Sequence, residues 1–392
     1  MHDVDPTQRV AALPVALCLV GSTSLKLWGL GLDERLKRQF AQAGIADVLS
    51  EAQARQRGGP IILVRADAVL DAPLIQLLRD SPGLLLMSDG PAPSQALAAH
   101  LTTGDFDVVL DSLAGRVVGR PPSGLKARAP SELKADFWKA LRKRETPYAI
   151  HATPDQMDKI AWRMFKGTYK GATDIVTKHL WPVPAFHATR ILAAADITPN
   201  MVTLVATALV FVVFWLFLDG HFGWGLALAW LMTFLDTVDG KLARTTLTSS
   251  KWGDILDHGI DLIHPPFWYV AWGLGLGVVG YAWTAETFWT VIIAILGGYI
   301  LQRVMEGIAI KWLGLEIHIW RPIDTLFRQV TARRNPNLLI LTLMTIFGRP
   351  DLGLIAVAVW TLTCLALHAV QLSQALAARR RGPLISWMAT RP

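Results

Sequence analysis

The chain has 392 residues, of which 52% are hydrophobic and 18% charged, and its mean hydropathy of +0.36 is higher than expected of a soluble globular protein. The length suffices for two or three domains, and the formal net charge of +7 is typical of cytoplasmic loops facing anionic lipid. Nucleic-acid binding is not expected, because no stripe of basic and aromatic residues accompanies the charge. The two cysteines, Cys18 and Cys364, form no CxxC pair, which argues against a disulfide framework or a zinc site.

Residues 1–153 are predicted to form an α/β domain. Short apolar runs typical of buried strands alternate with amphipathic segments typical of helices. Strands are expected at residues 14–21, 61–67, 83–89, 106–111 and 146–152, and helices at residues 32–44, 73–81, 94–101 and 132–144. This alternation predicts a mostly parallel, Rossmann-like sheet with helices on both faces.

Residues 154–197 are predicted to form a linker with interfacial helices. The stretch 154–179 has the composition of a long polar helix, which Pro182 helps to end. The next segment, 184–197, is amphipathic and precedes the first strongly apolar run. It is therefore expected to lie on the membrane surface.

Residues 198–392 are predicted to form an all-α membrane domain of six transmembrane helices. Thr198 and Pro199 are typical of a helix start, as an N-cap followed by proline in the first turn. The apolar segments are Met201–Leu218, Phe222–Leu235, Leu262–Trp283, Phe288–Leu301, Leu338–Phe347 and Leu352–Leu376. Basic residues cluster after the second, fourth and sixth segments, whereas Arg349 is the only one in the opposite loops. The positive-inside rule therefore places both termini in the cytoplasm.

The most informative stretch is 236–261, DTVDGKLARTTLTSSKWGDILDHGID. It has the pattern D-x2-D-G-x2-A-R-x8-G-x3-D-x3-D, formed by Asp236, Asp239, Gly240, Ala243, Arg244, Gly253, Asp257 and Asp261. Within each pair of aspartates, the spacing of three or four residues puts both on one face of a helix. Unpaired carboxylates beside apolar membrane segments are costly, and hard divalent cations are bound by carboxylate oxygens. Helix capping would explain one aspartate for each helix end, but not two pairs with Gly, Ala and Arg between them.

This pattern resembles the signature of the CDP-alcohol phosphotransferase family, with every fixed position of that signature at the family's spacing. The resemblance implies a phosphotransferase of phospholipid biosynthesis that moves a substituted phosphate group from a CDP-linked donor to the hydroxyl of an acceptor and releases CMP. The donor would be CDP-diacylglycerol or a CDP-polyol. We also expect a multi-pass homodimer in the inner membrane of a bacterium, surrounded by lipid, with the active site in the cytoplasm.

The resemblance further implies roles for the motif residues. Asp236, Asp239 and Asp257 would hold one Mg²⁺ or Mn²⁺ ion, and Asp236, Asp257 and Asp261 a second, so that two ions neutralise the diphosphate of the donor. Asp261 is the expected base for the acceptor hydroxyl. Arg244 is expected to pair with a phosphate oxygen. The residues expected to contact the CDP moiety are Asp239, Gly240, Ala243, Arg244 and Gly253.

The connection 316–337 is rich in arginine for a short membrane loop. In the related branch of the family that transfers to inositol phosphate, basic residues in this area hold the phosphate of the acceptor. Arg328, Arg333 and Arg334 are therefore candidates for binding an inositol phosphate or a related polyol phosphate. A second interpretation stays open, in which these side chains extend to lipid headgroups.

The N-terminal domain resembles a degenerate sugar nucleotidyltransferase over residues 25–45 and 64–78. Its loop GSTSLK, residues 21–26, is shorter than a loop that would cradle a triphosphate. Lys26 and Asp67 are therefore interpreted as a surface lysine and a strand-end aspartate, and the domain is expected to be catalytically silent.

Two other functions would explain part of this sequence. A bifunctional enzyme that makes and uses a CDP-alcohol such as CDP-inositol would need a complete nucleotide loop. An ion-coupled transporter would explain carboxylates at membrane depth, but not the glycine, alanine and arginine at fixed spacing, and the six segments show no inverted repeat.

Overall fold

The computed structural model describes residues 14–89, 95–102, 106–116, 124–132, 137–138, 143–249, 251–281 and 283–390. The side chains of residues 251–252 and 254–258, and with them the predicted ligand Asp257, lie outside this description. The chain divides into two compact units. One comprises residues 1–136 with 145–163, and the other comprises residues 137–144 with 164–392.

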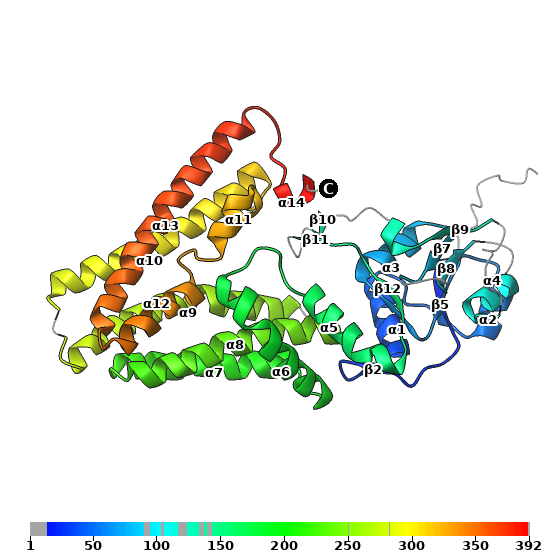
Figure 1. Cartoon of the computed structure of the whole chain (residues 1–392), viewed down its shortest axis with the longest axis horizontal. Coiled ribbons are helices and arrows are strands. Elements are labelled where there is room, and N and C mark those ends of the chain that lie inside the picture. Colours follow the sequence, from blue (N-terminus) through cyan, green and yellow to red (C-terminus); the bar gives the residue numbers. More distant parts are fainter. Residues whose placement is uncertain are drawn as a thin grey trace, which may run out of the picture. The chain divides into compact units, whose positions relative to one another are not determined.

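The first unit is built on a six-stranded sheet with the strand order β4-β1-β5-β8-β7-β9 (Figure 1). These strands are β4 (Val48–Leu49), β1 (Ala16–Val20), β5 (Ile61–Arg65), β8 (Ala96–Leu101), β7 (Leu84–Met87) and β9 (Lys126–Arg128). Strand β1 is parallel to β4 and β5, and β7 is parallel to β9, whereas β8 is antiparallel to both of its neighbours. The predicted α/β class is thus confirmed. Five of the six strands run in the same direction and β8 runs against them, so the sheet is mostly parallel with one antiparallel strand.

Helices pack against both faces of this sheet. They are α1 (Leu32–Gln42) and α3 (Ala72–Asp80) on one face, and α2 (Glu51–Gln56) and α4 (Phe106–Leu113) on the other. Leu17 of β1 packs with Phe40 of α1, whereas its neighbour Cys18 belongs to the cluster that contains Val109 of α4. Successive residues of a strand point to opposite faces, so one short strand contributes to both cores.

Three local predictions in this region are wrong. Residues 94–101 were expected to be helical, yet strand β8 occupies the middle of the sheet and all six of its residues are buried. Residues 106–111 were expected to be a strand, yet they begin helix α4, which buries one apolar stripe. Within 132–144, residues 137–138 and 143–144 form the strand pair β10 (Phe137–Trp138) and β11 (Lys143–Arg144) instead of a helix, and this pair belongs to the second unit. Tertiary burial outweighs local propensity in short segments of this kind.

Two strand pairs outside the six-stranded sheet complete the first unit. Strand β12 (Ala149–His151), predicted within 146–152, is antiparallel to β6 (Ala68–Leu70). Strands β2 (Lys26–Leu27) and β3 (Leu30–Gly31) form a hairpin that leads into α1.

The predicted long helix at 154–179 is interrupted. Helix α5 (Met157–Gly167) ends at a glycine, and a π-helical turn, η4 (Val176–Leu180), precedes α6 (Pro182–Ala194). Glycine lowers helix stability, and Gly167 is followed four residues later by Gly171. The stretch between α5 and η4 is therefore free to fold as a loop, and this loop becomes one wall of the candidate site.

The second unit is helical, and most of it consists of long helices (Figure 1). These are α7 (Pro199–Leu218), α8 (Phe222–Thr246), α9 (Lys251–Val278), α10 (Ala285–Ile308), α12 (Arg334–Ile346) and α13 (Pro350–Arg379), with the short α11 (Pro322–Arg328) before α12. The predicted start of α7 is confirmed, because the Thr198 side chain accepts a hydrogen bond from the Met201 N–H and Pro199 follows the cap.

Three helices of the described chain are long and apolar enough to cross a membrane. They are α7, α13 and the continuous helix formed by α10 with η5 (Ala309–Leu313). Only 28–39% of their apolar windows is buried within the protein, which leaves broad apolar surfaces for lipid. The second unit is thus an integral membrane domain. Helices α8, α9 and α12 do not meet the same criterion, since α12 has only 13 residues and α8 and α9 carry the charged motif.

Aromatic residues of α7 and α9 hold the membrane helices together. Phe217 packs edge-on against both Trp268 and Trp272, and all three are buried. Gly275 permits this close approach, because a Cβ atom there would lie 1.9 Å from the Phe217 carbonyl oxygen. The packing fixes α9 against α7 at one end of the helices. The motif residues lie toward the other end, in the second half of α8 and the first half of α9.

Candidate active site

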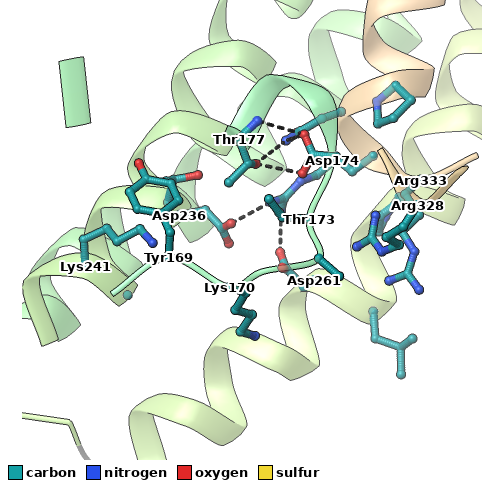
Figure 2. A pocket seen from close by; sticks show the side chains of 18 of the residues that line it. Tyr169, Lys170, Thr173, Asp174, Thr177, Asp236, Lys241, Asp261, Arg328 and Arg333 are labelled. Atoms are coloured by element: carbon teal, nitrogen blue, oxygen red, sulfur yellow. Dashed lines mark hydrogen bonds and ion pairs between the residues drawn. The ribbon is translucent and has the colours of Figure 1, made fainter. Parts of the chain in front are cut away.

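A cavity of about 560 Å³ lies in the second unit, where α8, α9 and the start of α12 meet the 168–177 segment (Figure 2). Its lining includes both carboxylates and guanidinium groups. The motif residues that line it are Asp236, Gly240, Ala243, Arg244 and Asp261. Helix α8 thus contributes most of the motif residues that line the cavity, and α9 contributes Asp261.

Asp236 of α8 and Asp261 of α9 converge on one guanidinium group. Arg334, the first residue of α12, donates from Nη2 to Asp236 Oδ2 at 2.6 Å and from Nη1 to Asp261 Oδ1. The side chain of Arg334 is only 15% exposed. Two carboxylates 25 positions apart therefore share a single cation at the cavity wall, and such a pair of oxygen donors also suits a hard divalent cation.

Asp239 lies one turn beyond Asp236 on α8 and is buried. Its Oδ2 accepts a hydrogen bond of 2.7 Å from Thr203 Oγ1 of α7, while Oδ1 is buried with no hydrogen-bond partner among the described residues. A buried carboxylate oxygen without a donor suits a metal ligand. Asp239 therefore offers a carboxylate oxygen of the kind that a hard divalent cation prefers, as Asp236 and Asp261 do. Gly253 lies on α9 but is not among the described residues that line the cavity.

Gly240 makes room for the arginine of the motif. A Cβ atom at this position would lie 3.0 Å from Arg244 Nη2, one turn further along α8. The missing side chain therefore leaves space for the guanidinium group beside the helix and next to the cavity. This is a physical reason for glycine and arginine at a spacing of four residues.

The 168–177 segment forms a wall that sequence reasoning missed. Tyr169, Lys170, Thr173, Asp174 and Thr177 line the cavity from this side (Figure 2). Its polar composition is typical of a surface helix, which is why a continuous helix was predicted here. The two glycines, Gly167 and Gly171, were the sequence feature that argued against a continuous helix. Polar side chains on a loop over a cavity are well placed to select a ligand.

Two contacts hold this segment in place. Asn335 Nδ2, at the start of α12, donates to Asp174 Oδ1 at 3.0 Å. On the other side, Lys241 of α8 donates to the Thr168 carbonyl at 3.1 Å, and its Nζ lies 3.2 Å from the centroid of the Tyr169 ring. Burial of the phenol raises the pKa of Tyr169, so the ring stays neutral beneath the ammonium group.

The three arginines predicted in the 316–337 connection divide between two places. Arg328 and Arg333 line the cavity (Figure 2), whereas Arg334 holds the carboxylates. Arg303 of α10, which sequence reasoning treated only as a loop charge, joins Arg328 and Arg333 in the lining. The sequence does contain a feature that points to a functional role for Arg303. Arg303 and Glu306 are ionisable residues three positions apart near the end of an apolar helix.

We expect the stability of the wild-type protein to fall more steeply on acidification than that of the His318→Gln variant. Burial, opposed in part by the hydrogen bond with Glu306, lowers the pKa of His318 from 6.5 to about 3, and the charge of Arg333 acts in the same direction. Between these values the unfolded chain binds a proton that the folded protein does not. The free energy of unfolding is therefore highest above pH 6.5 and falls by on the order of 1 kcal/mol for each pH unit below it.

Thermal unfolding in detergent between pH 7.5 and 5 measures this slope. His187→Gln, at an exposed position on α6, is the matched control and should keep the wild-type slope. Equal slopes for the wild type and His318→Gln would contradict the expectation.

Carboxylates that can bind a divalent cation, together with several arginines around one cavity, are the groups that an enzyme acting on phosphate esters would use. Residues 196–333 match the sequence model of the family described as CDP-alcohol phosphatidyltransferase. This part of the chain is thus similar to that family, as the spacing of the motif predicted.

Three similar proteins each match between 21% and 26% of this chain. Phosphatidylinositol phosphate synthase of Streptomyces avermitilis is 36% identical over 95 residues, which cover 24% of this chain and 37% of that protein. The protein of the same name from Mycobacteroides abscessus is 33% identical over 21% of this chain and 41% of its own length. Choline/ethanolaminephosphotransferase 1 of Arabidopsis thaliana is 35% identical over 26% of this chain and 28% of its own length. The matched regions thus span less than half of each relative.

Proposed function

We propose that the protein is an integral membrane phosphotransferase that moves a substituted phosphate group from a CDP-linked donor, such as CDP-diacylglycerol, to an acceptor hydroxyl and releases CMP. The acceptor we infer is a phosphorylated polyol, with inositol phosphate as the leading candidate. One observation carries this proposal. Asp236 and Asp261 converge beside a cavity that Arg303, Arg328 and Arg333 also line.

The proposed reaction joins the acceptor oxygen to the phosphorus of the substituted phosphate and breaks the bond between that phosphorus and the bridging oxygen of CMP. Asp261, which lines the cavity, would take the proton of the acceptor hydroxyl. Arg244 would pair with phosphate oxygens of the donor, next to the space left by Gly240. Mg²⁺ or Mn²⁺ held by Asp236, Asp239, Asp257 and Asp261 would neutralise the diphosphate.

The acceptor is inferred from charge. A phosphorylated acceptor would be repelled by the diphosphate of the donor unless cations separate the two. The cavity offers Arg328 and Arg333 in addition to Arg244 on α8. An uncharged alcohol would need no second group of arginines. Two of the similar proteins bear the name phosphatidylinositol phosphate synthase, which favours the same acceptor.

The test is release of CMP by the purified protein from CDP-diacylglycerol with inositol phosphate, compared with inositol, glycerol and choline. Turnover should require the phosphorylated acceptor and stop when a chelator removes divalent cations. Turnover with uncharged alcohols alone would refute the proposed acceptor, and absence of CMP release with every donor and acceptor would refute the proposed reaction.

We further propose six membrane crossings, with both termini and the cavity on the cytoplasmic side of a bacterial inner membrane, in a homodimer. Helices α8 and α9 have 25 and 28 residues, enough to cross a bilayer. Basic residues gather at the ends of helices on one side, with Arg349 on the other. Membrane-impermeant labelling in intact cells should modify Arg349→Cys and not Arg380→Cys, and native mass spectrometry of the purified protein should give twice the chain mass. The reverse labelling pattern, or a monomeric mass, would contradict these assignments.

The first unit is proposed to be a nucleotidyltransferase-like domain without cytidylyltransferase activity. The N–H of Gly21, which starts the short loop, donates to Glu51 Oε1 at 3.3 Å, so a carboxylate already occupies a donor that a phosphate would use. Asp67 is bound by Arg65 at 2.9 and 2.8 Å and by His151 at 3.0 Å. Burial alone would raise the pKa of Asp67, but these partners lower it, and they leave the carboxylate engaged within the protein.

We therefore expect no pyrophosphate release above background when the full chain is given CTP and a polyol phosphate. Lys26 is exposed on strand β2, so Lys26→Ala should leave this background unchanged. Release of pyrophosphate from CTP that disappears in Lys26→Ala or in Asp67→Asn would show that the first unit is an active enzyme.

A further inference from the structure

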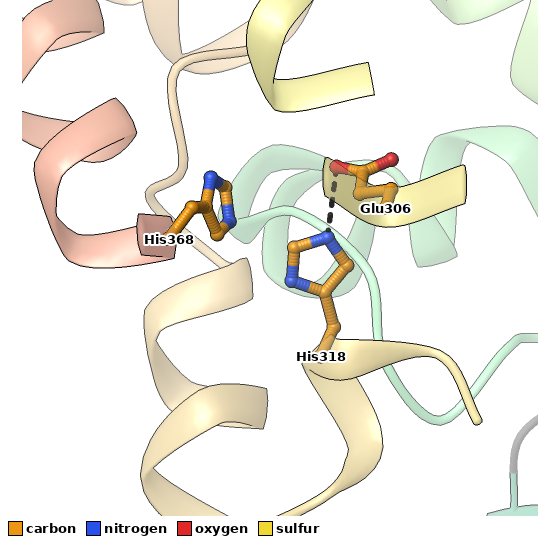
Figure 3. A group of neighbouring side chains, drawn as sticks. All are labelled: Glu306, His318 and His368. Atoms are coloured by element: carbon orange, nitrogen blue, oxygen red, sulfur yellow. Dashed lines mark hydrogen bonds and ion pairs between the residues drawn. The ribbon is translucent and has the colours of Figure 1, made fainter. Parts of the chain in front are cut away.

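Glu306, near the end of α10, contacts two of the arginines that line the cavity. Its Oε2 accepts a hydrogen bond of 3.0 Å from Arg303 Nη1, and its Oε1 accepts one from Arg333 Nη2. His318 Nε2 lies 3.1 Å from Glu306 Oε1 and 3.2 Å from Arg333 Nη2. Figure 3 shows Glu306 and His318 side by side, with His368 of α13 next to them.

We propose that Glu306 is a positioning residue for a phosphate-binding site, in which it holds the guanidinium groups of Arg303 and Arg333 at the cavity wall with the support of His318. The inference rests on the proposed function, because it assigns these arginines to the phosphate of the acceptor. No atom of Glu306 needs to touch the acceptor, since the residue acts through its two partners.

Electrostatic repulsion is the reason that such a residue is needed. Two guanidinium groups that line one small cavity repel each other, and both are largely withdrawn from water, with side chains 26% and 22% exposed. A single carboxylate between them offsets one charge and uses one oxygen for each arginine. The site then keeps a net positive charge for an incoming phosphate.

Both arginines retain donors for a ligand. The hydrogen bonds among the described residues engage Nη1 of Arg303 and Nη2 of Arg333, which leaves the other terminal nitrogen of each guanidinium group for a ligand. A phosphate group accepts several charge-assisted hydrogen bonds at once, and planar guanidinium groups suit it. The wall formed by Arg303 and Arg333 therefore combines fixed geometry with unused donors.

Two histidines, His318 and His368, lie beside Glu306 and its arginine partners. His368 Nδ1 lies 3.0 Å from Gln302 Oε1, one turn of α10 before Glu306. The nitrogen atoms of His318 and His368 and a carboxylate oxygen of Glu306 lie within 4.8 Å of one another, a spacing that would also suit a metal ion. However, the Arg333 guanidinium already contacts both Glu306 and His318, so a divalent ion there would adjoin a fixed positive charge. We therefore infer that Arg333, and not a metal ion, supplies the positive charge beside Glu306 and His318.

The test uses the full-length protein in detergent and the variant Glu306→Gln. The amide offers only one oxygen and turns an N–H toward an arginine, so it cannot hold both guanidinium groups. We expect the KM for inositol phosphate to rise about tenfold and the KM for CDP-diacylglycerol to stay close to the wild-type value. The melting temperature should fall, because the two guanidinium groups then repel each other with no carboxylate between them. Glu286→Gln, at an exposed position in the first turn of the same helix, is the matched control.

A double-mutant cycle shows whether Glu306 acts through its partner. In an Arg333→Ala background, Glu306→Gln should cause little further loss of acceptor affinity. Full additivity of the two losses, or equal losses for donor and acceptor, would overturn the positioning role and leave Glu306 as a general structural residue. Zinc at one ion per chain that is lost in His318→Gln would overturn it in favour of a metal site.

Binding of inorganic phosphate, measured by calorimetry without donor, separates this inference from the proposed reaction. If CMP release fails with every acceptor but phosphate binds and is weakened about tenfold by Glu306→Gln, the proposed function is wrong and the positioning role stands. If CMP is released from the phosphorylated acceptor while Glu306→Gln changes neither phosphate affinity nor acceptor KM, the reaction stands and the positioning role is wrong.

Discussion

Asp261→Asn is expected to lower the rate of CMP release by about 10²–10⁴-fold and to change the affinity for the CDP-linked donor by no more than about threefold. The amide keeps the size of the carboxylate, and its oxygen can still accept the hydrogen bond from Arg334. It cannot take a proton from the acceptor hydroxyl, and it is a poorer ligand for a divalent cation than a carboxylate. The variant should therefore fold and bind the donor but lose the chemical step.

The measurements are single-turnover CMP release and calorimetric titration with CDP-diacylglycerol in detergent. Asp219→Asn is the matched control, because Asp219 is an exposed aspartate at the end of α7 and lies outside the cavity lining. It should retain wild-type rates. Undiminished CMP release by Asp261→Asn would remove Asp261 from the mechanism, whatever the control shows.

Arg333→Ala is expected to raise the acceptor KM by about 10–100-fold while the donor KM stays within about twofold of the wild-type value. One charge-assisted hydrogen bond to the acceptor phosphate is lost, and Glu306 then loses one of its two arginine partners. The effect should be specific to phosphorylated acceptors, because an uncharged alcohol makes no such bond.

The neighbouring residue Arg334 is expected to behave differently from Arg333, because it contacts the carboxylates. Arg334 binds Asp236 and Asp261, so Arg334→Ala is expected to lower kcat and not to act selectively on the acceptor KM. Arg380→Ala, at an exposed position after α13, controls for the loss of one positive charge near the membrane. If Arg333→Ala lowers thermal stability but leaves acceptor kinetics unchanged, the arginines of this connection belong to the lipid surface.

The similarity to a known family and the membrane character of the second unit could be predicted from the sequence. Both depend on local patterns, namely aspartates at fixed spacing and apolar runs long enough to cross a bilayer. The start of α7 was predictable for the same reason, since Thr198 and Pro199 form a cap within one turn. In the first unit, the α/β class was correct, but the strand at 96–101 and the helix at 106–113 were exchanged, because in short segments burial in the sheet outweighs propensity.

The grouping of charges around the cavity was decided only by the tertiary structure. Arg333 and Arg334 are adjacent in sequence and predict the same role, yet the start of α12 directs one to Glu306 and the other to Asp236 and Asp261. Residues 27 to 98 positions apart meet in these contacts, and no local pattern encodes such pairings. The sequence by itself thus determined which chemistry the motif can perform. The packing of α8, α9, α10 and α12 decided which arginine serves the carboxylates and which lines the cavity, because a long charged side chain takes its partner from the helices beside it.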